Sequence, residues 1–139
     1  MSGYPRVPYE NMLEKLPGFI GHAFEQMSHQ YILATSHLPI IEIGRWWGPD
    51  KNTRTEEKID IVARTSADIW LFGECKWTGK KIGVAEYQLL VYRSHLVVTE
   101  DKREFWLFGK SGFTDELQAL ALSDETLHLV SLEQLFSGK

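Results

Sequence analysis

The chain has 139 residues, a formal net charge of -4 and a pI of about 5.7, which argues against a protein whose whole surface binds nucleic acid. Hydrophobic residues make up 43% and charged residues 24%, so collagen-like and wholly disordered chains are excluded. No apolar run approaches the roughly 20 residues that cross a bilayer, and we expect neither a membrane segment nor a secretion signal. The single cysteine, Cys75, forms no internal disulfide and is compatible with the cytoplasm.

The N-terminal part of the chain predicts two helices. Residues 1–17 are expected to be a lead-in or linker with a short helix at 10–16, which Pro17 and Gly18 would end. Residues 18–139 are expected to form one domain. From residue 19 to about residue 35, apolar residues recur every three or four positions and predict an amphipathic helix. Its predicted buried stripe consists of Ile20, Ala23, Phe24, Met27 and Tyr31.

After Pro39 the composition changes to short β-type runs separated by turn residues. The predicted strands are 40–47, 58–64, 68–77, 103–108 and 126–130, and the predicted helices among them are 84–97 and 115–122. The order α-β-β-β-α-β-α-β indicates an α/β domain.

One carboxylate stands in an otherwise apolar strand, KIDIVAR at 58–64. Because side chains alternate along a strand, Asp60 and Val62 are expected on one face. Ile59, Ile61 and Ala63 are expected on the other.

A second carboxylate lies in the next predicted strand, LFGECKW, where alternation places Glu74 and Lys76 on one face and Cys75 on the other. A hairpin centred on Ala67 would put Asp60 directly across from Glu74. Like charges in directly opposed positions are destabilising, with Cβ atoms about 4.5–5.5 Å apart.

Two carboxylates and a lysine on one sheet face predict a site for a hard cation, because charges are rarely buried unless they are paired or coordinate a metal. Mg²⁺ is commonly held by one or two carboxylates. Lys76 would then orient or deprotonate an attacking water. A solvated Asp60 with a Glu74–Lys76 surface pair is an equally open interpretation of the spacing.

Asp60 in one strand, followed after a short turn by Glu74-Cys75-Lys76 in the next, resembles the PD-(D/E)xK nuclease superfamily, which includes restriction endonucleases and archaeal Holliday junction resolvases. The resemblance implies that Asp60 and Glu74 bind Mg²⁺ or Mn²⁺ and that Lys76 assists water attack. The proline usual before the aspartate is replaced here by Ile59.

The same resemblance implies a restriction-endonuclease-like fold, with a mixed central β-sheet flanked by α-helices. It implies that Glu25, on the helix ahead of the strands, is an auxiliary metal ligand. It also implies that Gln88, on the helix after the lysine strand, contributes to catalysis.

A closer resemblance covers residues 19–136. GFIGHAFEQM, IGRWW, EKIDIVA and GECKW resemble the nuclease-like domain at the C-terminus of archaeal-type ATPases. This implies an ATPase module as partner, in cis or in trans. Because no GxxxxGK[ST] loop occurs, the sequence gives no support for an ATP site in this chain, and we expect a C-terminal fragment or a stand-alone copy.

Basic residues flank the predicted site and are candidate phosphate contacts. They are Arg45, Lys51, Arg54, Lys58, Lys80 and Lys81. An ordinary solvated loop, interspersed with Glu56 and Glu57, is an equal alternative. For Trp46 and Trp47, base stacking is open, but core packing of at least one is favoured.

Two other candidate sites are weaker. His22, Glu25 and His29 share a helix face, which we interpret as a solvated polar face rather than a zinc site because the usual HExxH arrangement is absent. Cys75 is expected to be a buried, inert thiol.

The leading hypothesis is Mg²⁺-dependent hydrolysis of DNA phosphodiester bonds. The alternative is a non-catalytic module of the same fold that binds DNA or regulates an ATPase. A homodimer that resolves DNA junctions is a third hypothesis.

Overall fold

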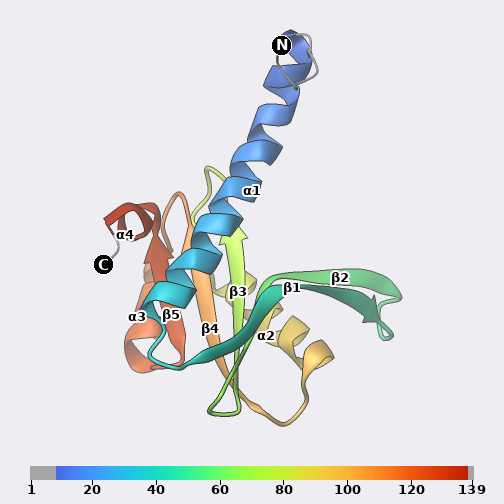
Figure 1. Cartoon of the computed structure of the whole chain (residues 1–139), viewed down its shortest axis with the longest axis vertical. Coiled ribbons are helices and arrows are strands. Elements are labelled where there is room, and N and C mark those ends of the chain that lie inside the picture. The colour runs from blue at the N-terminus through green and yellow to red at the C-terminus, as the bar shows by residue number, and fades with distance from the viewer. Residues whose placement is uncertain (1–8, 138–139) are drawn as a thin grey trace.

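The structure, a computed structural model, describes residues 9–137 and contains a central sheet with helices on both faces (Figure 1). In chain order the elements are α1 (Tyr9–Thr35), β1 (Ile40–Asp50), β2 (Thr55–Thr65), β3 (Ile69–Lys76), α2 (Val84–Val97), β4 (Lys102–Gly109), α3 (Asp115–Ser123), β5 (Leu127–Ser131) and α4 (Leu132–Ser137). The predicted order is confirmed, and α4 is an addition to it.

The five strands lie in the order β1-β2-β3-β4-β5. The pairs β1–β2 and β2–β3 are antiparallel, whereas β3–β4 and β4–β5 are parallel. Parallel neighbours need a crossover connection, which α2 and α3 supply. The sheet is therefore mixed, as the predicted fold class requires.

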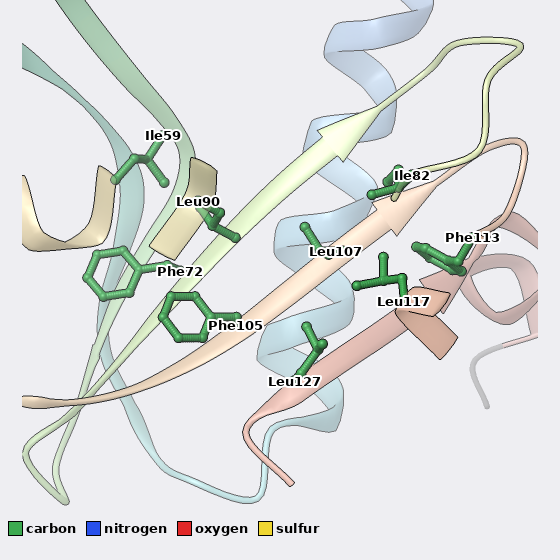
Figure 2. Packing of buried hydrophobic residues seen from close by; sticks show 9 residues of the cluster. All are labelled: Ile59, Phe72, Ile82, Leu90, Phe105, Leu107, Phe113, Leu117 and Leu127. Atoms are coloured by element: carbon green, nitrogen blue, oxygen red, sulfur yellow. The ribbon is translucent and has the colours of Figure 1, made fainter. Parts of the chain in front are cut away.

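Both faces of the central part of the sheet are buried, and each has its own core. On one face, Leu90 of α2 and Leu117 of α3 pack onto side chains of the strands (Figure 2). On the other face, Phe24 and Ile32 of α1 are 2% and 0% exposed and pack over β2, β3 and β4. Burial on both faces explains the unbroken apolar run of β4, because a strand between two helical layers has no solvated face.

The first helix differs from its prediction. α1 continues through Pro17 and Gly18 as one helix instead of two. A proline in a helix removes one backbone donor and costs about 3 kcal/mol, and the turn before it is built from good helix formers. The buried stripe also differs: Ser28 is buried between Phe24 and Ile32, whereas Ala23 is exposed. The domain boundary at residue 17 stays a prediction.

The region from 48 to 57, predicted as a loop, belongs to a long β1–β2 hairpin whose turn occupies 51–54. Asp50 is 1% exposed, and its carboxylate accepts hydrogen bonds from the Asn52 amide at 2.9 Å and from the Tyr92 hydroxyl of α2. The Tyr92 bond lowers the pKa of Asp50. These contacts fix the turn, which local sequence could not reveal because Tyr92 is 42 residues away.

A second contact joins the hairpin to α2. Arg93 Nε donates to Glu57 Oε2 at 2.9 Å, with both side chains 18% exposed. The hairpin is thus attached to α2 at two places. Lys58 belongs to β2, as the predicted strand 58–64 requires, and that strand begins three residues earlier, at Thr55.

Gly73 permits close packing between β2 and β3. A Cβ atom at this position would lie 3.0 Å from Ile61 Cβ and 3.1 Å from Ile61 Cδ1, and Ile61 is fully buried. Gly73→Ala should lower the free energy of unfolding by about 1–3 kcal/mol through overpacking, measured by urea denaturation. The matched control is Gly21→Ala in α1, where nothing lies within 4 Å of the added Cβ. The control should keep or raise stability, since alanine is the better helix former. Equal stability of Gly73→Ala and wild type would contradict this packing.

Candidate active site

A β-bulge in β2 places the first predicted site residue. The pairing register of β1 with β2 shifts between Gly44 and Trp46, so that Asp60 and Ile61 together oppose Arg45. A bulge interrupts the alternation of side chains between the two faces. Asp60 therefore reaches the α1 side of the sheet, where it faces the same pocket as residues of α1.

The bulge also corrects a predicted face. Ile61 and Ala63 pack in the core under α1, as one face, while Val62 packs in the other core. Ile59 was predicted beside Ile61 but lies in the core under α2, and Asp60 was predicted on the face of Val62 but lies on the α1 side. The predicted faces are therefore correct for the residues from Ile61 onward and reversed for those before the bulge.

The strands β2 and β3 separate next to Asp60. Their pairs run from Arg64 opposite Trp70 to Ile61 opposite Gly73, which is the predicted register. Past this point β2 pairs only with β1, and β3 only with β4, and Figure 1 shows the hairpin turning away from β3.

Where the β2–β3 ladder ends, the Asp60 carboxylate accepts a backbone hydrogen bond from β3. Its Oδ2 atom accepts a hydrogen bond from the backbone N–H of Cys75 at 2.9 Å. Asp60 is only 4% exposed. A side-chain carboxylate thus occupies the place of a strand carbonyl, and it is held beside Glu74.

A pocket of about 330 Å³ opens at this separation. Its lining includes four residues predicted for catalysis or metal binding, Glu25, Asp60, Glu74 and Lys76, and two predicted phosphate contacts, Arg45 and Lys58. Phe24 and Trp77 form an apolar wall, with ring centroids 5.2 Å apart.

Three cations in this pocket pair with its three carboxylates. The pairs are Lys58 Nζ with Asp60 Oδ1 at 3.1 Å, Lys76 Nζ with Glu74 Oε1 at 3.5 Å, and Arg45 Nη2 with Glu25 Oε2 at 2.5 Å. The cations are the exposed partners: the side chain of Lys58 is 68% exposed and that of Asp60 only 4%. Pairs with one solvated partner are weak, so the lysines are available to a ligand that competes for them.

The two central carboxyls differ in acidity. Burial, and next the charge of Asp60, raise the pKa of Glu74 to about 7. Burial also acts to raise the pKa of Asp60, but the Cys75 amide and Lys58 outweigh it and lower that pKa. Among the described residues, nothing donates a hydrogen bond to the buried Glu74 Oε2. Asp60 is therefore a stabilised anion, whereas Glu74 is strained when ionised.

Glu74 and Asp60 fit a hard divalent cation. A positive ion beside them would relieve their repulsion and satisfy the free Glu74 oxygen, and Mg²⁺ is commonly bound by one or two carboxylates. Glu25 is bonded to Arg45 instead of to this pair. Within residues 9–137, no cluster of three or more His, Cys, Asp or Glu side chains has a metal-binding arrangement.

Other predicted residues lie outside the pocket. Gln88 is exposed on α2, Lys51 and Arg54 lie in the hairpin turn, and Lys80 and Lys81 are exposed after β3. Cys75 does line the pocket, but burial raises the pKa of its thiol well above its usual value, so the reactive thiolate is scarce at neutral pH.

Sequence reasoning missed three contacts of Asp60. The Cys75 amide and Lys58 both bind its carboxylate, and His29 Nε2 lies 3.2 Å from its backbone carbonyl. The spacing of Lys58 and Asp60, two residues apart in a strand, was a signal for the lysine contact. No local sequence pattern predicts the contact with the Cys75 amide, since that contact depends on the separation of β2 from β3.

Comparisons with known proteins place the chain in a family and a fold. The model of the DUF234 family, described as archaeal and bacterial proteins of unknown function, matches residues 2–87. Comparison with curated proteins gives no significant match. Within residues 9–137, no helix has both the length and the apolar character of a membrane span.

Several solved structures are similar to the chain, among them the three that follow. A protein of unknown function, AF1548, has 17% identity over 83% of this chain and 58% of its own, with a TM-score of 0.52. The MspJI restriction endonuclease, in complex with a 27-mer oligonucleotide, has 13% identity over 99% of this chain and 34% of its own, with a TM-score of 0.56. A repair endonuclease from Pyrococcus abyssi has 14% identity over 95% of this chain and 49% of its own, with a TM-score of 0.45.

The chain thus spans between 34% and 58% of the length of these proteins. The likeness to MspJI, at these low identities, shows the fold: a restriction-endonuclease-like α/β domain, as predicted.

The raised pKa of Glu74 gives a prediction for stability in chelator-treated buffer. The pKa is about 7 in the folded chain against 4.5 for a free glutamate. The folded state therefore holds more protons between these values, and the free energy of unfolding falls as the pH rises through them, by on the order of 3 kcal/mol. Glu74→Gln should remove this fall, measured by urea denaturation at pH 5 and pH 8.

The control is Glu116→Gln, at an exposed position of α3. It should keep the pH dependence of the wild type. Parallel pH dependences for wild type and Glu74→Gln would contradict a strained Glu74 carboxylate.

Proposed function

We propose that this chain, which belongs to the DUF234 family of archaeal and bacterial proteins of unknown function, is a Mg²⁺-dependent endonuclease that hydrolyses DNA phosphodiester bonds. The observation that carries the proposal is the buried pair of Asp60 and Glu74, with Lys76 Nζ 3.5 Å from Glu74, in an open pocket. The PD-(D/E)xK resemblance and the restriction-endonuclease-like fold support it.

Asp60 and Glu74 would hold Mg²⁺ or Mn²⁺, with Glu25 as an auxiliary ligand if its bond to Arg45 exchanges. Such an ion lowers the pKa of bound water and offsets charge on the phosphate oxygens. Lys76, whose side chain is 39% exposed, orients the attacking water or neutralises the charge that develops on phosphorus.

Lys58 and Arg45 would contact the phosphates on either side of the cleaved bond. Each pairs with a pocket carboxylate, so the side chains of the pocket are close to charge balance. A divalent ion adds the positive charge that a polyanionic substrate requires. MspJI, of similar fold, has been solved with an oligonucleotide, which supports contact with DNA in this chain.

We also propose an ATPase module as the partner, in cis or in trans, on the resemblance of GECKW and its companion segments to the domain that ends archaeal-type ATPases. The alternative function is a non-catalytic module that binds DNA or regulates that ATPase. A homodimer and a cytoplasmic location stay predictions.

Asp60→Asn and Lys76→Met should each lower Mg²⁺-dependent plasmid nicking by at least about 100-fold, because each removes a group that acts on the reacting phosphate. Nicking is measured by conversion of supercoiled plasmid to open circle, with circular dichroism to verify folding. The control is Glu116→Ala, at an exposed α3 position outside the pocket, which should nick like the wild type.

Two results would contradict the assignment. Retained nicking in folded Asp60→Asn would exclude the pocket as the catalytic centre. DNA binding by the wild type without nicking, in Mg²⁺ or Mn²⁺, would favour the non-catalytic module.

A further inference from the structure

Trp47 presents a large aromatic surface to solvent on the β1–β2 hairpin. Its exposed fraction is 64%, whereas its neighbour Trp46 packs against the core under α2. Alternation along β1 accounts for the difference, since adjacent residues project to opposite faces. An exposed tryptophan on a rigid strand is not explained by the packing of this domain.

The surroundings of Trp47 are cationic. It is paired with Lys58 across the hairpin, and directly paired residues project to the same face. Arg45 lies two residues earlier on that face. Lys58 and Arg45 are the two cations that pair with Asp60 and Glu25 in the pocket. The Trp47 ring therefore lies next to the pocket. It shares β1 with Arg45 and is paired with Lys58 on β2.

The opposite face of the hairpin is fixed to the body of the domain. Arg93 binds Glu57, and the Tyr92 hydroxyl binds the Asp50 carboxylate at the turn. Figure 1 shows the hairpin extending beyond the rest of the sheet, with its outer part away from β3. Trp47 thus stands on a preorganised surface, so little ordering is needed when it binds a ligand.

We propose that Trp47 stacks on an unpaired base of a nucleic acid strand, while Arg45 and Lys58 bind the phosphates next to that base. This inference rests on the proposed function, and it names the substrate class: DNA that is single-stranded beside the cleaved bond. Aromatic rings that stack on bases, together with a cationic track for the backbone, are the usual means of binding single strands.

An intact duplex fits this surface less well. Bases inside a duplex have both faces covered by their neighbours, so a ring on a sheet surface can stack only on a base that has left the stack. The cationic face is also short. It ends at Glu56, which pairs with Pro49 two residues beyond Lys58 and Trp47 towards the turn. The contact is therefore limited to one base and its flanking phosphates.

The test is fluorescence anisotropy with labelled oligothymidine and with a blunt duplex of equal length, in low-salt buffer containing Ca²⁺ in place of Mg²⁺, so that a divalent cation is present without Mg²⁺-dependent cleavage. The wild type should prefer oligothymidine. Trp47→Ala should weaken that binding by about 5-fold to 150-fold, the usual effect of removing one stacked aromatic. Trp47→Phe, which keeps an aromatic face, should retain most of it.

A second readout is tryptophan fluorescence, which oligothymidine should quench in the wild type but not in Trp47→Phe. The matched control is Phe136→Ala, because Phe136 is 72% exposed and lies on α4, at the β5 edge of the sheet and away from β1. This control should bind oligothymidine like the wild type.

Four results would overturn the inference: no binding by the wild type, equal or tighter binding of the duplex, unchanged binding by Trp47→Ala, or a wild-type dimer in sedimentation that Trp47→Ala dissociates without loss of oligothymidine affinity. The last would assign Trp47 to a contact between two copies of the chain. Cleavage of single-stranded circular DNA in Mg²⁺ separates the two proposals. Trp47-dependent binding without cleavage supports this inference and contradicts hydrolysis, whereas cleavage with unchanged Trp47→Ala binding does the reverse.

Discussion

The hydrogen bond from the Cys75 amide to Asp60 Oδ2 is the contact on which the pocket depends. It forms because the ladder between β2 and β3 ends at the pair Ile61–Gly73. Beyond that pair the Cys75 N–H has no strand partner on β2. A buried backbone donor without a partner costs about 1–3 kcal/mol, and a buried carboxylate without donors costs more. Each group satisfies the other. The result is a carboxylate fixed to the backbone of the strand that carries Glu74 and Lys76.

The site combines a rigid frame with an electrostatic strain. Apolar cores on both faces of the sheet hold β3 and β4 in place, and α2 fixes the hairpin through Tyr92 and Arg93. Within that frame Glu74 is buried beside an anion, which raises its pKa to about 7. Strongly perturbed carboxyls in a pocket are typical of functional sites, because a ligand that relieves the strain gains binding energy from it.

Much of this arrangement was predictable from sequence, and what escaped prediction has physical causes. The β2–β3 register followed from a three-residue turn and a period of two, both of which are local. The bulge at Asp60 depends on pairing with β1, and the hairpin turn on a bond from Tyr92, so neither is visible in the local pattern. Alternation therefore gave the wrong face for Ile59. For RWW the pattern required two opposite faces but did not say which tryptophan was exposed.

The central claim is that Asp60 and Glu74 form one divalent-cation site. Isothermal titration of Mn²⁺ into the wild type and into the Asp60→Ala, Glu74→Ala double variant tests it most directly, since it needs neither substrate nor partner. The account predicts one saturable site in the wild type and no binding in the folded double variant. Binding that is absent from the wild type, or unchanged in the double variant, would contradict it.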